Sequence, residues 1–151
     1  MNVAVGLMEG RPSVEADLTG TFTGSDDKQY GTGRHRLTSE VTLYPSEFSA
    51  CAFALDDMTI GIGFHWERKE RQLFRGAIRM IKRPTGLTVI NEVPLEEYVT
   101  SVISSEMSAN CPIELLKAHA VISRSWLWFP KMGHSPGAPE ARPLFPRGEG
   151  L

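Results

Sequence analysis

One carboxylate and two cations in the last third of the sequence have types and spacing that could do chemistry. Glu106 stands at the end of an apolar helical stripe, and Lys117 and Arg124 lie seven residues apart on the next expected helix. Apolar neighbours such as Met107, and the negative end of its own helix, would both disfavour the charged form of Glu106. A carboxyl group that stays protonated near neutral pH can act as a general acid.

These residues also have simpler interpretations, which the sequence leaves open. Glu106 could be a solvated acid just past a helix end, and a nearby cation would favour its charged form. Two like charges on one stripe of a buried helix need an anion to meet them, since their burial is otherwise costly. That anion could belong to a ligand or to a carboxylate of the same two helices, namely Glu96, Glu97 or Glu114.

Two helices must position these side chains. Leu95, Val99 and Val102 follow one another at steps of four and three, so "VPLEEYVTSVISSEM" predicts a helix with one apolar face. "NCPIELLKAHAVISRSWLWF" predicts a second helix, with Pro112 in its first turn. Apolar side chains lie on nearly every face of this second helix, and we expect it to be largely buried.

The residues before these helices predict mostly antiparallel β-sheet, so the expected fold class is α+β. Alternating apolar residues in 3–7 and 14–18 are typical of strands that are buried on one face. Asp56-Asp57, between "CAFAL" and "MTIGI", predicts a hairpin turn, and residues 84–86, between "LFRGAIRMI" and "GLTVIN", predict another. We interpret the Gly- and Asp-rich stretch "GTFTGSDDKQYGTGRHR" as an exposed loop.

Composition and charge exclude several classes of protein. The chain of 151 residues is 41% hydrophobic and 23% charged, with a net charge of -2, and it has no long basic run. This argues against a nucleic-acid partner and against a polybasic membrane anchor. Cys51 and Cys111 form no CxxC pair, and the histidines show no metal-ligand spacing. We therefore expect buried free thiols, no metal site and no cofactor.

The stretches "INEVPLEEYVTSVISSEM" and "CPIELLKAHAVISRSW" together carry a resemblance to a known family. They are similar to the pattern N-x-V-P-L-E-x-Y-L, V-x-x-E-M-P and E-A-L-K-A-Q-A-V-A-A-R-T-Y of the stage II sporulation protein D (SpoIID)/LytB family. The close match covers residues 87–127, and the β-rich part fits the family layout more loosely. The sequence departs from the pattern at Ser108, His119 and Ser125-Trp126, where the family has Pro, Gln and Thr-Tyr.

The resemblance implies an enzyme, because members of this family are lytic transglycosylases that cleave peptidoglycan and prefer glycan strands without stem peptides. Glu106 aligns with the catalytic glutamate, and Lys117 and Arg124 align with residues that handle substrate. One acid suffices because the C6 hydroxyl of the sugar attacks and gives a 1,6-anhydro-muramyl end, whereas hydrolytic glycosidases use two carboxylates. The guanidinium of Arg124 would suit the lactyl carboxylate of a peptide-free muramic acid.

The resemblance also implies a partner, a location and a domain organisation. We expect peptidoglycan glycan strands as the partner and a cell-wall or periplasmic, extracytoplasmic location, although "MNVAVGLMEG" has no signal-peptide pattern. Residues 1–129 are expected to form the first part of a family domain truncated at its carboxyl end. Residues 130–151 hold five prolines and four glycines, which predicts a disordered or non-native tail. The alternatives are an inactive fragment and a non-catalytic wall-binding module that enhances a cell-wall amidase.

Overall fold

The computed structural model describes residues 1–60, 65, 67–107 and 110–132, with backbone alone for 105–106 and 128–132. The described chain forms two compact units. Among the described residues, the β unit contains residues 4–92, and the helical unit contains residues 1–3 together with those from 93 to 132.

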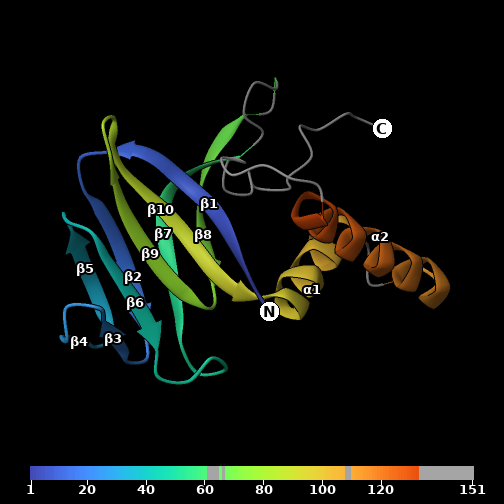
Figure 1. The fold of residues 1–151 in the computed structure, drawn as a ribbon, viewed down its shortest axis with the longest axis horizontal. Helices are drawn as coiled ribbons and strands as arrows, with labels where there is room; N and C mark the ends of the chain where they lie inside the picture. Colours follow the sequence, from blue (N-terminus) through green and yellow to red (C-terminus); the bar gives the residue numbers. More distant parts are fainter. Residues whose placement is uncertain (61–64, 66, 108–109, 133–151) are drawn as a thin grey trace. The chain divides into compact units, whose positions relative to one another are not determined.

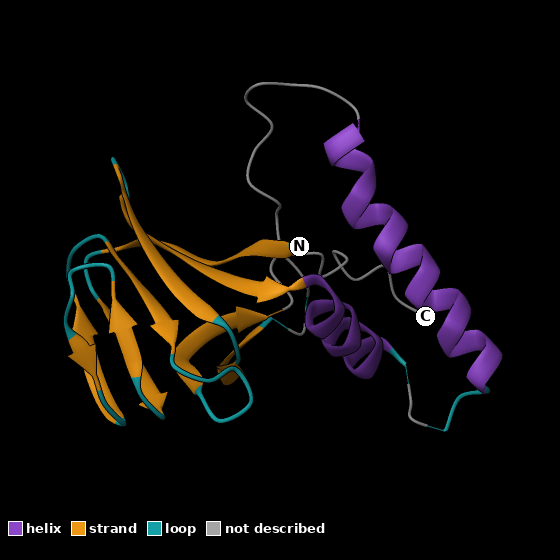
Figure 2. Cartoon of the chain, turned by 60° about the horizontal axis from the view of Figure 1, so that its bottom comes forward, coloured by secondary structure: helices purple, strands orange, loops and turns teal. Residues whose placement is uncertain are grey.

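Antiparallel strands make up the first part of the described chain and two helices follow, which confirms the expected α+β class (Figure 1). One sheet has the strand order β1-β10-β9-β6-β3-β4, and the other has the order β5-β2-β7-β8. Figure 2 distinguishes the strands, in orange, from the two helices, in purple. The strands are β1 (Asn2–Arg11), β2 (Val14–Thr19), β3 (Phe22–Gly24), β4 (Gln29–Tyr30), β5 (Gly33–Leu37), β6 (Val41–Pro45), β7 (Ala52–Ile60), β8 (Arg68–Phe74), β9 (Ala77–Arg83) and β10 (Gly86–Pro94). The helices are α1 (Leu95–Glu106) and α2 (Ile113–Met132).

The core of the β unit is built from both sheets. Phe22, Leu43 and Ile78 of the six-stranded sheet and Phe53 and Leu55 of the four-stranded sheet are fully buried in one cluster. Burial of large apolar side chains from two sheets is the main stabilising contribution in such a sandwich. The β unit therefore has a core of its own.

β2 shows how the sequence alternation produces a sheet with one apolar face. Val14, Ala16 and Leu18 are buried in the core cluster, whereas Glu15 is exposed and Asp17 is partly exposed. Successive side chains of a strand point to opposite faces, so every second residue meets the core. The predicted strand is confirmed, and its carboxylates lie on the face opposite to the core.

Asp56-Asp57 does not form the predicted hairpin turn, so that prediction is wrong. β7 runs through both residues, and its pairing with β8 shifts register between Leu55 and Met58, which marks a β-bulge. Asp57 has φ +55, a left-handed backbone conformation that Asp adopts more readily than most residues. The two aspartates bend the strand locally, and β7 pairs with β8 on both sides of them.

The hairpin predicted at residues 84–86 is confirmed, since β9 and β10 pair from Arg83 opposite Gly86 onward. The stretch "LFRGAIRMI", however, contains the end of β8 and most of β9, where we expected one strand. Gly76 separates them with φ +100, and a Cβ there would lie 2.4 Å from the carbonyl oxygen of Glu92. Glycine is needed at this point, where the chain passes from the four-stranded to the six-stranded sheet.

The Gly- and Asp-rich stretch of residues 20–36 is not a loop throughout, so that prediction is wrong in part. It contains β3 and β4, which pair with each other, and most of β5, which pairs with β2. Phe22 is fully buried, and its partner Tyr30 packs against the core cluster, which fixes this hairpin. The turn that contains Asp27, at φ +62, has the backbone that such a composition predicts.

The two cysteines are free thiols in different surroundings. Cys51 is buried in the core cluster, and its thiol donates to the carbonyl oxygen of Thr21 at 3.4 Å. Cys111 is only partly buried. The expectation of buried free thiols is therefore confirmed for Cys51 and is too strong for Cys111.

Candidate active site

α1 ends at Glu106, the residue for which the sequence predicts acid–base chemistry. Val99 is 2% exposed and Val102 is partly buried, which confirms the apolar face of this helix. Met107 has extended backbone, and its N–H donates to the carbonyl oxygen of Ile103 at 2.9 Å. Glu106 continues the spacing of the apolar stripe, but its side chain lies outside the described residues. Its backbone is at the negative end of the helix dipole.

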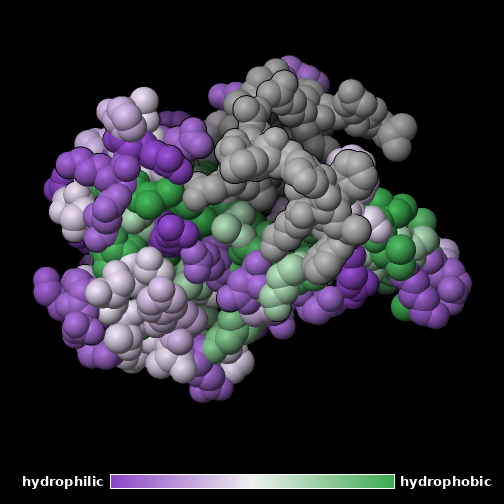
Figure 3. Space-filling view, viewed as in Figure 1, coloured by the Kyte–Doolittle hydropathy of each residue, from purple (hydrophilic) through white to green (hydrophobic). Residues whose placement is uncertain are grey.

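α2 is far more exposed than its sequence predicts. Leu115, Ile122 and Trp126 are 45%, 54% and 64% exposed and fall on one helical stripe, and Figure 3 shows apolar atoms at the surface of this helix. α1 contacts α2 within the helical unit, but one neighbouring helix covers one face only. The expectation of a largely buried helix is therefore wrong for the described residues.

Lys117 pairs with a carboxylate of its own helix. Its Nζ lies 2.8 Å from Oε1 of Glu114, three residues earlier, and both side chains are mostly exposed. An exposed pair at this spacing contributes little to stability, because solvent screens the charges. The contact is one of the alternatives that the sequence left open. It holds Lys117 weakly and leaves it accessible to another anion.

Arg124 makes a stronger contact, which joins the two helices. Its Nε donates to Oε1 of Glu96 at 3.0 Å, and its Nη2 donates to Oε2 of the same carboxylate. These hydrogen bonds lower the pKa of the Glu96 carboxyl and raise the pKa of Arg124. A two-point contact between a guanidinium and a carboxylate fixes the orientation of both groups. A substrate carboxylate would need the same two-point geometry to bind Arg124.

The contact that Arg124 makes with α1 and the position of Glu106 are at opposite ends of α1. Arg124 contacts Glu96 in the first turn of α1, whereas Glu106 is in the last turn. Ten residues at 1.5 Å each place these two positions about 15 Å apart along the helix axis. Lys117 is in the second turn of α2, the end of that helix that follows Glu106 in the chain. The two cations therefore lie at different positions relative to the candidate acid.

The sequence analysis did not single out a charged cluster on the β unit, which we call the charge ladder (Glu15, Asp17, Arg34, Asp56 and Arg71). Arg34 contacts Glu15 at 3.0 Å and also contacts Asp56. Arg71 contacts Asp56 at 2.9 Å and Asp17 at 2.8 Å. The signal was present in "VEADL" and "GRHRL", whose charges alternate with the same period of two on adjacent strands.

The charge ladder predicts an acid-sensitive contribution to stability. Hydrogen bonds from Arg71 lower the pKa of the Asp56 carboxyl, and the charges of Arg71 and Arg34 act in the same direction. A carboxyl with a lowered pKa stabilises the fold above its unfolded pKa of about 3.9, and this contribution disappears as the pH falls through the folded pKa. We therefore expect Asp56→Asn to lower the unfolding midpoint in urea at pH 7 and to flatten its decline below about pH 4.

Glu9→Gln is the matched control for that measurement, because Glu9 is exposed on β1 and forms no ion pair with any described residue. It should leave both the midpoint at pH 7 and the acid slope unchanged. A slope for Asp56→Asn equal to that of the native chain would contradict the role assigned to Asp56.

Within the described residues, no three His, Cys, Asp or Glu side chains gather in a way that could hold a metal ion. Among the described helices, neither combines the length and apolar character that a membrane span requires.

Residues 83–142 match the family of SpoIID, the stage II sporulation protein. This part of the chain is similar to the SpoIID family. The SpoIID segment (residues 83–142) includes β10, α1, α2 and all three predicted site residues. This similarity indicates a function related to sporulation and the cell wall for the matched segment. The match continues past residue 129, and the division of the chain at that residue stays a prediction.

The chain is also similar to a curated protein over a stretch of comparable length. An uncharacterized protein of Brachyspira hyodysenteriae (strain ATCC 49526 / WA1) is 36% identical to the chain over 56 residues. The similarity covers 37% of this chain and 15% of that protein, so the chain matches a small part of the relative's length. No solved structure matches the chain.

Proposed function

We propose that the SpoIID segment forms part of the active site of a peptidoglycan lytic transglycosylase, with Glu106 as its single acid and base. The observation that carries the proposal is the family match, which covers Glu106, Lys117 and Arg124 together. The place of residue 106 at the end of α1 supports it. The carboxyl end of a helix disfavours a charged carboxylate and so favours a group that donates a proton.

In the proposed reaction, the Glu106 carboxyl donates its proton to the glycosidic oxygen as the bond from C1 of the muramyl residue breaks. The C6 hydroxyl of the same residue attacks C1, and its proton passes to the Glu106 carboxylate. A 1,6-anhydro ring forms, the leaving sugar gains a hydroxyl, and Glu106 is protonated again. No water is consumed, so the second carboxylate that positions water or attacks in hydrolytic glycosidases is not needed.

The two cations are proposed to bind carboxylates of the glycan. Both are now paired with glutamates, but the pairs are exposed, and an exposed ion pair contributes little to stability because solvent screens its charges. A lactyl carboxylate can therefore displace Glu96 from Arg124 and take over the same two hydrogen bonds. Arg124 contacts Glu96, which lies about 15 Å from residue 106 along the axis of α1. Arg124 would therefore bind a sugar farther along the glycan strand than the sugar that reacts.

We expect Arg124→Lys to weaken binding of peptide-free glycan by about fivefold to tenfold while leaving the rate at saturation nearly unchanged, because lysine cannot make the two-point contact. Glu96→Gln should act in the opposite direction, since it removes the internal competitor for Arg124. Both effects are measured by titration of defined glycan fragments. Equal binding by the native chain and both variants would show that the Arg124–Glu96 pair only joins the helices.

The function itself is tested by incubating the full-length protein with glycan strands from which an amidase has removed the stem peptides. We expect products that lack one water relative to hydrolysis products, detected by mass spectrometry. A protein that releases no such product but accelerates a cell-wall amidase on intact peptidoglycan would have the enhancer function instead.

The proposal also places the protein outside the cytoplasmic membrane, where peptidoglycan lies. Cell fractionation should therefore find the full-length protein in the wall or periplasmic fraction. A protein confined to the cytoplasm would contradict a function on the wall.

A further inference from the structure

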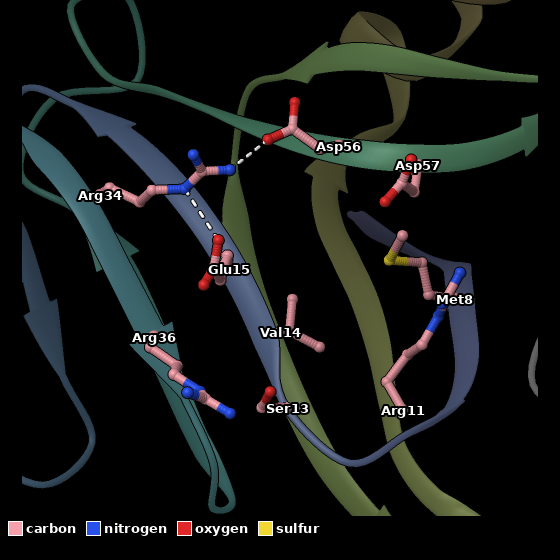
Figure 4. A pocket seen from close by; sticks show the side chains of 9 residues that line it. All are labelled: Met8, Arg11, Ser13, Val14, Glu15, Arg34, Arg36, Asp56 and Asp57. Atoms are coloured by element: carbon pink, nitrogen blue, oxygen red, sulfur yellow. Dashed lines mark hydrogen bonds and ion pairs between the residues drawn. The ribbon is translucent and has the colours of Figure 1, made fainter.

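A hollow on the β unit is lined mostly by charged side chains. Its volume is about 320 Å³, at the lower end of the range of small-ligand pockets. Its walls come from the end of β1, the start of β2, β5 and the bulge of β7 (Figure 4). It lies entirely within the β unit and uses none of the residues assigned above to glycan cleavage.

Two arginines in this pocket have no acidic partner among the described residues. Arg34 contacts both Glu15 and Asp56, so these two carboxylates already have a cationic partner within the charge ladder. Arg11 and Arg36 line the same pocket and form no ion pair with any residue in the described part of the chain. Unpaired guanidinium groups beside a hollow favour an anion there, because each presents several N–H donors and a full charge.

The β-bulge adds a carboxylate without such a partner. Consecutive residues of a regular strand face opposite sides, but the bulge allows Asp56 and Asp57 both to line the pocket. Asp57 forms no ion pair with the residues that the structure describes. Figure 4 shows Asp57 and Arg36 on opposite sides of the pocket, and the partly buried, apolar side chain of Met8 lines it as well. Among the described residues, the pocket thus offers an unpaired cation and an unpaired anion.

We propose that this pocket binds a short zwitterionic peptide. Its carboxylate would lie on the guanidinium of Arg36, its ammonium on the carboxylate of Asp57, and a small side chain against Met8. Arginine binds carboxylates through two parallel hydrogen bonds, which sets the orientation of the peptide. Arg11 supplies a second positive charge to the wall, which strengthens the preference for a negatively charged end.

The proposal is tested by titrating the isotope-labelled chain with alanyl-alanine and following backbone amide shifts by NMR. Saturable shifts should appear at the residues around the pocket. Arg36→Gln should weaken binding about tenfold, because it removes a charge-assisted contact. Asp57→Asn should weaken it by a similar factor, and it should fold normally because Asn accepts the same left-handed backbone. Arg75→Gln, an exposed arginine outside the pocket, is the control and should bind like the native chain.

The capped peptide N-acetyl-alanyl-alanine amide separates charge recognition from contact with the apolar side chain of Met8, and it should bind much more weakly than alanyl-alanine. Inorganic phosphate separates a peptide site from a simple anion site. The proposal is overturned if no saturable shift appears, if the capped peptide binds equally well, or if Arg36→Gln binds like the control. It is also overturned if phosphate competes fully and Asp57→Asn leaves alanyl-alanine binding unchanged.

Discussion

Glu106→Gln in the full-length protein is expected to abolish the release of 1,6-anhydro-muramyl products from peptide-free glycan. The substitution keeps the size and shape of the side chain but removes its transferable proton. General acid–base assistance contributes on the order of 100- to 10,000-fold to a reaction rate, and here one residue would supply both steps. The loss should be in the rate, and binding of the glycan strand should stay nearly unchanged, because a neutral amide can occupy the same place.

Glu97→Gln is the matched control, since it makes the same chemical change in the exposed first turn of the same helix. Its rate of product release should stay within about twofold of the native rate, as expected for a surface substitution away from the reacting atoms. Product release by Glu106→Gln at the native rate would show that Glu106 is not the acid. Stimulation of a partner amidase by both the native protein and Glu106→Gln, without product, would favour the enhancer function.

Phe53→Ala is expected to have the largest effect on stability. Phe53 is fully buried in the core cluster, and its ring stacks on Phe74 with the centroids 5.4 Å apart. Truncation of a buried phenylalanine costs about 3–5 kcal/mol, because transfer free energy and packing contacts are both lost. Since a native domain is stable by about 5–15 kcal/mol, this single change removes a large part of the free energy of unfolding.

The measurement is the urea midpoint of the strand signal in circular dichroism. Leu73→Ala is the matched control, because Leu73 lies on the adjacent strand and is 68% exposed. It should change the free energy of unfolding by no more than about 0.5 kcal/mol. A similar midpoint for the two variants would mean that the sandwich core contributes less to stability than its burial indicates.

Residue patterns that repeat over a few positions were sufficient to predict much of the fold. The alternation in residues 14–18 and the steps of three and four in α1 predicted a strand and a helix that the structure confirms. Both patterns depend on side-chain directions within one element, so they need no knowledge of distant residues. The same reasoning failed for Asp56-Asp57, because a left-handed aspartate fits both a hairpin turn and a bulge. The pairing of β8 with β7 both before and after the two aspartates decided between them.

The sequence by itself determined the α+β class, the spacing of Glu106, Lys117 and Arg124 on two helices, and the motif that relates them to the SpoIID family. Only the tertiary structure decided which carboxylates the cations meet. Lys117 meets Glu114 in the same helix, but Arg124 meets Glu96, which is 28 positions earlier in the chain. Contacts of this kind depend on how separate elements pack. No local pattern can therefore choose among three candidate glutamates, or bring four strands together around a pocket.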